Sequence, residues 1–199
     1  MATIRLNQSR RDTDVLMHSA ASFHRKIAEL EDFVEQFYAQ KDMMHDLSHI
    51  RRFLKTARSL SKRYHRDDGI LTYAAYFHGI DRKKHKDILT GFLESQGLQK
   101  RQVEHVFRVA KESRKESRPA TMEGMILHDA HLIEGGRTFL AVKSLVTGLR
   151  QGDSLPEIID YFEKEVDGRF KCYLPEVGRF YSEKEEFARR FFHDLKKNL

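Results

Sequence analysis

Apolar residues recur at intervals of three and four along most of this chain, a periodicity typical of amphipathic α-helices. The pattern predicts a first helix over about residues 12–38 and a second over about residues 46–64. Their inward-facing positions are Leu16, Ile27, Leu30, Phe33, Val34, Phe37 and Tyr38 in the first, and Ile50, Phe53, Leu54, Ala57 and Leu60 in the second. Each helix is expected to bury one face and expose the other.

Two later segments are apolar on almost every side. The first, ILTYAAYFH at residues 70–78, predicts a third helix in the centre of the fold, because a helix without a polar face is normally buried. The second, MEGMILHDAHLIEGG at residues 122–136, ends in two glycines. Both segments carry histidines, so the predicted core also contains ionisable groups.

The remaining helices are predicted from their periodicity and their end signals. A short helix over residues 87–97 is closed by Gly97, and further helices follow over residues 99–113 and 138–152. Ser154 opens the next helix with Glu157 in a capping box, and Ser182 with Glu185 is expected to open the last one in the same way. No strand-like alternation and no internal repeat is present, so the sequence predicts a single all-α domain over residues 1–199.

The composition supports a helical class and narrows the cellular setting. The chain has only 3 prolines and 11 glycines among 199 residues, and 40% of its residues are hydrophobic. The single cysteine, Cys172, cannot form an internal disulfide, which favours a reducing compartment. The sequence has neither a secretory signal nor an apolar run of membrane-spanning length. A cytoplasmic location with no membrane partner is therefore expected.

The chain is moderately basic, with a formal net charge of +6. Basic side chains gather in HIRRFLKTARSLSKRYHR, DRKKHK and KESRKESR. These runs are either solvated helix faces or a surface that attracts phosphorylated ligands, nucleotides or nucleic acid. The charge alone does not separate these two interpretations.

Three elements carry candidate metal chemistry. His45 and His49 are four residues apart, so both imidazoles would lie on one helix face. His78 ends the most apolar helix, where an imidazole needs a hydrogen-bond partner or a metal ion. Asp129, in the third element, lies in an apolar context between His128 and His131 and needs a cation or several donors nearby.

The order of these elements resembles that of the small HD-domain phosphohydrolase-like proteins. The shared features are a helix start HDLSHIRR, a helix end AAYFH and the segment LHDAHLIEG. The resemblance covers about residues 43–136 as a motif-bearing core, and it implies a helical bundle with the C-terminal helices of residues 138–199 packed on that core. It also implies a divalent metal ion, such as Mn, Fe, Ni, Zn or Mg, held by histidines and aspartates.

Carried over onto this chain, the resemblance assigns the ligand and catalytic roles to His49, His78 and Asp129. The aspartate that follows the second histidine in the family falls on Gly79, so one ligand is missing. His131 replaces the second acid of the family's DAD element, and the histidine of the intervening helix has no counterpart in FRVAKESRKES. Asp81 or His131 could supply a further metal ligand.

Two functions follow from this resemblance. The first is a metal-dependent phosphohydrolase acting on a phosphomonoester or nucleotide, with Lys83, Lys84 or Arg52 contacting phosphate. The second is a catalytically degenerate HD domain that binds a nucleotide, nucleic acid or protein partner. A homo-oligomer is compatible with either function. Gly79 is the residue that separates them, because without its acid the family's metal site is incomplete.

Overall fold

The computed structural model describes residues 25–199, in two units divided between Phe37 and Tyr38. In the first unit, residues 25–37 are helical, and the Gln36 side chain donates a hydrogen bond to the Phe33 carbonyl at 3.0 Å. The remainder of the first predicted helix lies outside the described residues. The second unit, Tyr38–Leu199, contains all the candidate site residues.

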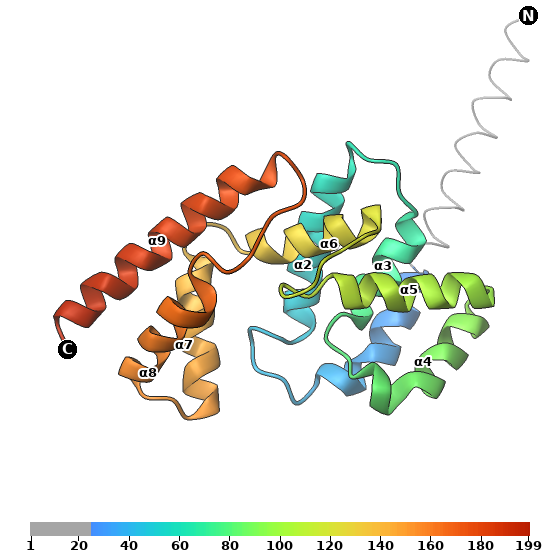
Figure 1. Ribbon diagram of the computed structural model, residues 1–199. Helices are drawn as coiled ribbons and strands as arrows, with labels where there is room; N and C mark the ends of the chain where they lie inside the picture. Colours follow the sequence, from blue (N-terminus) through green and yellow to red (C-terminus); the bar gives the residue numbers. More distant parts are fainter. Residues whose placement is uncertain (1–24) are drawn as a thin grey trace, which may run out of the picture. The chain divides into compact units, whose positions relative to one another are not determined.

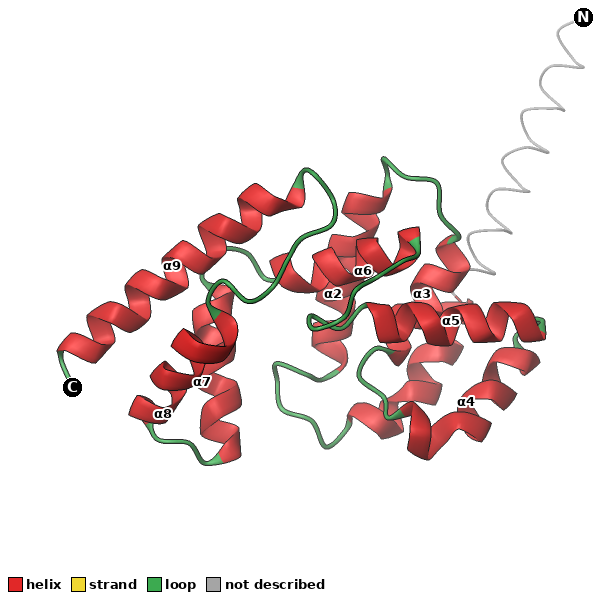
Figure 2. Ribbon diagram, viewed as in Figure 1, coloured by secondary structure: helices red, strands yellow, loops and turns green. Residues whose placement is uncertain are grey.

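Every regular element in the described residues is helical, which confirms the predicted all-α class (Figure 2). The prediction of a single domain over residues 1–199 stays a prediction. The helices of the second unit are α2 (Leu47–Ser61), α3 (Asp68–Phe77), α4 (Arg82–Ser95), α5 (Lys100–Glu112), α6 (Met122–Ile133), α7 (Phe139–Gln151), α8 (Leu155–Tyr161), the π-helical turn η1 (Phe162–Val166) and α9 (Val177–Lys197).

Side-chain caps fix where the helices that carry the site begin. Asp46 accepts hydrogen bonds from the backbone N–H groups of Ser48 and His49 at the start of α2. Thr121 accepts from the N–H of Gly124 at the start of α6. These caps satisfy backbone donors that have no partner within the helix. They set the register that directs His49 and the histidines of α6 into the protein.

Helix α3 lies in the centre of the second unit, as its all-round apolar pattern predicted. Its residues 70–77 are all buried. It packs against α2, α5 and α6, and α2 also packs closely on α6 (Figure 1). The C-terminal end of α3 is therefore enclosed by helices from distant parts of the sequence, and His78 follows directly at that end.

A second apolar cluster is formed by α7, α8, η1 and α9, which lie together at one side in Figure 1. Its buried members are Ala141, Ile158, Ile159, Phe162, Val166, Ala188 and Phe192. The buried ammonium of Lys184 on α9 donates to the backbone carbonyls of Leu132 and Glu134, where α6 ends. This contact ties the C-terminal helices to the element that carries His131.

Two helix starts differ from the prediction. Helix α4 begins at Arg82 rather than near residue 87, because Asp81 caps it by accepting from the N–H of Lys83. Helix α9 begins at Val177 rather than at Ser182, and Glu185 accepts from the N–H of Gly168 instead of completing a capping box. By contrast, the predicted capping box of Ser154 and Glu157 is present and confirmed. No helix within residues 25–199 is both long and apolar enough to cross a bilayer.

Two glycines in helix interiors provide a matched test of the packing. A Cβ at Gly148 in α7 would collide with the Ile158 side chain of α8, whereas a Cβ at Gly91 in α4 would meet open space. Alanine is favoured over glycine in a helix by up to about 1 kcal/mol, and overpacking costs about 1–3 kcal/mol. We expect Gly91→Ala to raise the free energy of unfolding in urea and Gly148→Ala to lower it. Equal effects from the two variants would contradict the close α7–α8 packing.

Candidate metal centre

Three histidines from different elements converge beside the buried end of α3. They are His49 on α2, His78 directly after α3 and His131 on α6, and each offers one nitrogen within 4.8 Å of the other two. Their ring centroids are 5.9 Å apart for His49 and His78, 5.6 Å for His49 and His131, and 4.5 Å for His78 and His131. This arrangement, here called the histidine triad, is the strongest candidate for a functional site.

Hydrogen bonds fix which nitrogen of His78 and His131 carries the proton. The Ser113 hydroxyl donates to the Ala110 carbonyl at 2.8 Å, so it accepts from Nδ1–H of His78 at 2.6 Å. The Ser113 carbonyl can only accept, and it receives Nδ1–H of His131 at 3.3 Å. Both rings therefore keep the lone pair on Nε2, and one residue at the end of α5 holds the tautomers of two histidines.

The third ring is held by a buried carboxylate. Nδ1 of His49 lies 2.6 Å from Oε2 of Glu134, whose other oxygen accepts from Nε of Arg52 at 3.0 Å. Burial would raise the pKa of Glu134, but the hydrogen bond and charge of His49, together with Lys143 and Arg52, hold that pKa below its usual value. The ionised carboxylate accepts Nδ1–H of His49 and leaves its Nε2 lone pair free, an arrangement common behind metal-binding histidines.

All three imidazoles are neutral near pH 7. Burial lowers the pKa of His78 and of His131 well below the usual value, and repulsion from the Lys143 ammonium, and from the other histidines when they are protonated, acts in the same direction. Burial also lowers the pKa of His49, against the opposing hydrogen bond from Glu134. Neutral imidazole is the form that binds a metal ion.

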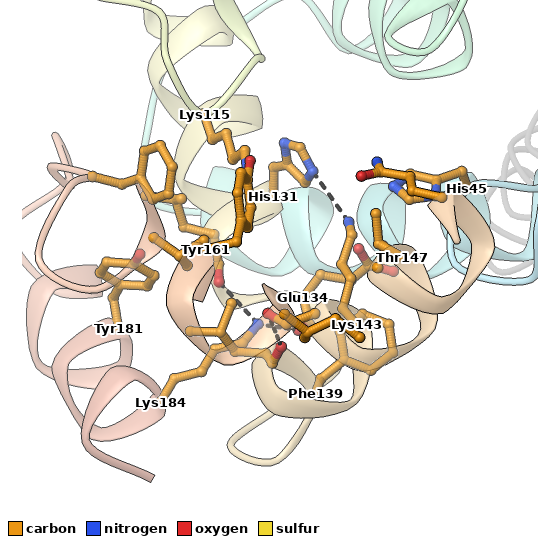
Figure 3. A pocket seen from close by; sticks show the side chains of 18 of the residues that line it. His45, Lys115, His131, Glu134, Phe139, Lys143, Thr147, Tyr161, Tyr181 and Lys184 are labelled. Carbon is orange, nitrogen blue, oxygen red and sulfur yellow. Dashed lines mark hydrogen bonds between the residues drawn. The ribbon is translucent and has the colours of Figure 1, made fainter. Parts of the chain in front are cut away.

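Lys143 on α7 places a cation beside the triad. Its Nζ lies 3.5 Å from Nε2 of His131, a contact drawn as a dashed line in Figure 3. Burial lowers the pKa of Lys143, while the charge of Glu134 opposes this shift. The lysine therefore faces the same lone pair of His131 that a metal ion would use.

The triad fits a divalent ion that accepts imidazole ligands. Three neutral rings whose Nδ1 atoms have fixed partners match the three-histidine type of open metal site, provided that Lys143 is displaced from Nε2 of His131. No carboxylate belongs to this group among the described residues. Imidazole suits Zn, Cu, Fe and Ni, whereas Mg and Mn favour carboxylate oxygens. The donor set therefore differs from the mixed histidine and aspartate set that the resemblance implied.

The triad includes His49, His78 and His131 of the predicted ligands but not Asp129. The buried carboxylate of Asp129 accepts from the backbone N–H groups of Tyr173, at 2.9 Å, and Leu174, at 2.6 Å, and also lies 2.9 Å from Nδ1 of His128. These contacts supply the donors that a buried carboxylate requires. Asp129 thereby links α6 to the segment before α9.

Asp81 and Asp46 are engaged as helix caps. Asp81 is exposed and caps α4, and Asp46 caps α2. His45 has its Nδ1 within 2.8 Å of the Asp42 carboxylate, and its ring centroid lies 6.2 Å from that of His49. Of these three residues, His45 is the one next to the triad.

The position of the missing aspartate is filled by other side chains. A Cβ on Gly79 would lie 2.8 Å from Nζ of Lys41 and 3.1 Å from the Tyr38 hydroxyl. The Lys41 ammonium donates to the Gly79 carbonyl at 2.5 Å and lies 4.1 Å from the centre of the Tyr38 ring. A lysine therefore lies where the side chain of an aspartate at position 79 would project.

A basic cavity opens beside the triad. It has a volume of about 950 Å³ and is lined by His78, His131 and Gly79 on one side. Its cationic lining residues are Arg82, Lys83, Lys86, Lys111, Arg114 and Lys115, with Asp81 and Glu116 as the acidic ones. Lys83 thus lines this cavity, Lys84 is not among its lining residues, and Arg52 is bound to Glu134 and Ser48.

Sequence reasoning missed Ser113 and Glu134 as supports of the triad. Glu134 follows three residues after His131, but only the ending of α6 there turns its side chain toward His49 on a helix 85 positions away. Ser113 is the last residue of a predicted helix with no motif around it. Contacts of this kind depend on tertiary packing, and no local signal in the sequence marks them.

Known structures show the same fold. The chain is similar to Lin1889 from Listeria innocua (16% identity, 88% of this chain and 96% of that chain, TM-score 0.67). It is also similar to an HD-superfamily hydrolase from Bacillus thuringiensis (17%, 88% and 97%, TM-score 0.65) and to YpgQ from Bacillus subtilis in complex with ADP (16%, 86% and 97%, TM-score 0.65). No family model and no curated protein matches the chain. The predicted HD-type helical fold is thereby confirmed.

The neutral triad predicts a specific pH dependence of stability. Because the folded-state pKa values of His78 and His131 lie below the unfolded value, the unfolded chain takes up protons first as the pH falls. Stability should therefore fall from pH 6.5 to pH 5, by roughly 1.4 kcal/mol per pH unit for each buried histidine. Urea unfolding of the metal-free protein would measure this slope. His131→Gln should reduce it, whereas His193→Gln, at an exposed position on α9, should leave it unchanged.

Proposed function

We propose that this protein is a metal-dependent phosphohydrolase whose divalent ion is held by Nε2 of His49, His78 and His131. The observation that carries the proposal is the convergence of three neutral imidazoles whose Nδ1 atoms are all engaged. A bound ion of this kind would lower the pKa of a water molecule and polarise a phosphoryl oxygen. The similarity of this fold to that of an HD-superfamily hydrolase also supports the proposal.

The protein's own residues would contribute orientation and charge. Glu134 and Ser113 hold the rings so that their lone pairs face one point, which reduces the reorganisation needed on binding. The hydrogen bond from His49, with smaller contributions from Lys143 and Arg52, holds the pKa of Glu134 below its usual value, and Arg52 also fixes the position of this carboxylate. Lys143, beside His131, is positioned to contact a phosphoryl oxygen, since its ammonium is near the triad and would be drawn to an anion.

The basic cavity supports a phosphorylated substrate. Arg82, Lys83 and Arg114 can neutralise several phosphate charges next to His78 and His131. The solved YpgQ complex with ADP adds support for a nucleotide in a protein of this fold. A phosphomonoester or nucleotide is therefore the proposed substrate, with the phosphate in the basic cavity and the scissile bond facing the triad.

Removing a triad member should abolish metal binding. We expect the parent protein to bind Co²⁺ or Zn²⁺ more tightly than Mn²⁺ or Mg²⁺, because its ligands are all imidazoles. His131→Ala should weaken Co²⁺ binding by more than about 100-fold, and Glu134→Gln by about 10–100-fold through loss of ring orientation. Titration followed by the visible absorption of Co²⁺ gives both affinities. His193→Ala is the matched control and should bind Co²⁺ like the parent.

The same titration decides between the triad and the ligand set that includes Asp129. Because Asp129 bonds the backbone of Tyr173 and Leu174, Asp129→Asn should lower the thermal midpoint but leave the Co²⁺ spectrum of the folded protein unchanged. A changed spectrum in Asp129→Asn together with an unchanged one in His131→Ala would overturn the proposed ligands. Negligible metal binding by the parent protein would contradict the proposed metal centre.

A second function is favoured by the two lysines at the site. Lys41 occupies the place of the missing acid, and Lys143 faces the His131 lone pair. These charges suit an anion as well as they suit a metal-assisted reaction. The alternative is a domain that binds a nucleotide or another phosphorylated partner without hydrolysing it.

Restoring the acid distinguishes the two functions. In Gly79→Asp the new carboxylate would meet the Lys41 ammonium and form an ion pair, so we expect little gain in Mn²⁺ affinity. In Gly79→Asp combined with Lys41→Met the carboxylate is free, and Mn²⁺ affinity should rise at least about tenfold. A degenerate domain predicts phosphoesterase turnover in the double variant alone, whereas an active parent already turns over with Co²⁺ or Zn²⁺. Calorimetry and phosphate release measure the two quantities, with Lys41→Met as the control.

A further inference from the structure

A second cavity, here called the apolar cavity, adjoins the triad at His78 and His131. It has a volume of about 210 Å³ and is bounded by the end of α6 and by α7, α8, η1 and α9. Figure 3 shows Lys143 and Thr147 of α7 side by side, with Tyr181 and Lys184 of α9 at the opposite side of the view. Apart from His78, His131, Glu134 and Lys143, the residues that line this cavity have no role in the proposed reaction.

Its walls are suited to an uncharged ring. The apolar lining residues are Leu132, Phe139, Leu140, Ile158, Tyr161, Val166 and Phe170. A dry apolar cavity of about 150 Å³ is enough to hold a benzene molecule. The larger volume here can therefore take a single ring or a compact pair of fused rings.

Two hydroxyl groups in this lining have no hydrogen-bond partner in the described part of the chain. They are Oγ1 of Thr147 and the phenol of Tyr181, both buried. The Tyr181 side chain is only 4% exposed, and burial raises its pKa, as does the Glu185 carboxylate, an acceptor with which a ligand would compete, so the phenol keeps its proton. Leaving such groups unpaired costs about 1–3 kcal/mol each, and a bound ligand with matching polar atoms would remove that cost.

Several charged lining residues are already engaged by other groups. Lys184 donates to two backbone carbonyls, and Glu134 is bound by His49 and Arg52. The Lys115 ammonium lies 4.8 Å from the centre of the Phe170 ring and 3.8 Å from Glu116. Thr147 and Tyr181 therefore offer neutral hydrogen-bonding groups within this lining, whereas Lys143 lies at the triad end beside His131.

The apolar cavity adjoins the basic cavity, with which it shares three lining residues, Lys115 and two histidines of the triad. His78 and His131 line both this cavity and the basic cavity. One ligand can therefore place an anionic group among the lysines and arginines and an uncharged group among the apolar side chains, with the triad between them. A sugar or glycerol phosphate lacks the apolar area to use the second cavity.

We propose that the apolar cavity binds the uncharged, ring-bearing part of the substrate, with Thr147 and Tyr181 as its hydrogen-bonding specificity residues. The substrate class is thus a phosphate ester of a neutral aromatic or heteroaromatic group rather than of a small polyol. This proposal rests on the proposed function for the identity of the anionic part. The ring site itself is defined by the cavity and its two unpaired hydroxyls.

Binding to the metal-free, full-length protein tests the ring site without turnover. The probes are 1-naphthyl phosphate, which carries a fused ring, and glycerol 2-phosphate, which carries none. Calorimetry should show at least about tenfold tighter binding of 1-naphthyl phosphate, because ring burial adds apolar contact. Uncharged 1-naphthol should compete with 1-naphthyl phosphate and should leave glycerol 2-phosphate binding unchanged.

Two conservative variants test the hydroxyls. Thr147→Val and Tyr181→Phe should each weaken binding of 1-naphthol by about threefold to tenfold, the range expected for one neutral hydrogen bond. Thr90→Val, on α4 and outside the cavity lining, is the matched control and should bind like the parent. Since Oγ1 of Thr147 has no partner in the described part of the chain, Thr147→Val should not lower the thermal midpoint, which a purely structural role would do.

The outcomes separate this proposal from the proposed function. Equal affinities for the two phosphate probes, or unchanged 1-naphthol binding in both hydroxyl variants, would overturn the ring site even if the triad binds Co²⁺ as expected. Selective ring binding in a protein that takes up no metal would uphold the ring site and overturn the hydrolase. A lower thermal midpoint in both variants would show that the hydroxyls contribute to stability and would overturn their role in specificity.

Discussion

The hydrogen bond between His49 and Glu134 is the contact on which the site depends. It joins α2 to the residue that ends α6, across 85 positions of sequence, and both side chains are almost fully buried. A buried carboxylate is stable only when its oxygens are satisfied, so Arg52 and His49 must both be in place. The same contact orients the His49 ring, and Lys184 holds the backbone of Glu134 from α9. Glu134 therefore links the packing of α9 to the geometry of the triad.

Much of the fold could be predicted because it follows from local patterns. The all-round apolar run before His78 gave a central helix, and Ser154 with Glu157 gave a helix start, since capping is decided within four residues. The start of α9 could not be located in this way, because Ser182 and Glu185 have the letters of a capping box but lie within a longer helix. There the helix begins at Val177, and Glu185 bonds Gly168, a residue distant in sequence.

The candidate site was predicted only in part, for the same physical reason. His49 and His78 could be identified from motif order, and His131 was among the alternatives. Asp129 and His131 are two residues apart on one helix and therefore point in different directions, so the letters alone did not reveal which one faces the other histidines. The filling of the Gly79 position by Lys41 and the support from Ser113 required the packed structure, because both partners come from segments far away in sequence.

Ser113 gives the site a property that separate supports would not provide. Its hydroxyl and its carbonyl hold rings from two different elements, after α3 and on α6, while its own position is set by the end of α5. Any small displacement of that helix end would be transmitted to both imidazoles at once. The two Nε2 lone pairs should consequently move together rather than through independent motions of the two side chains.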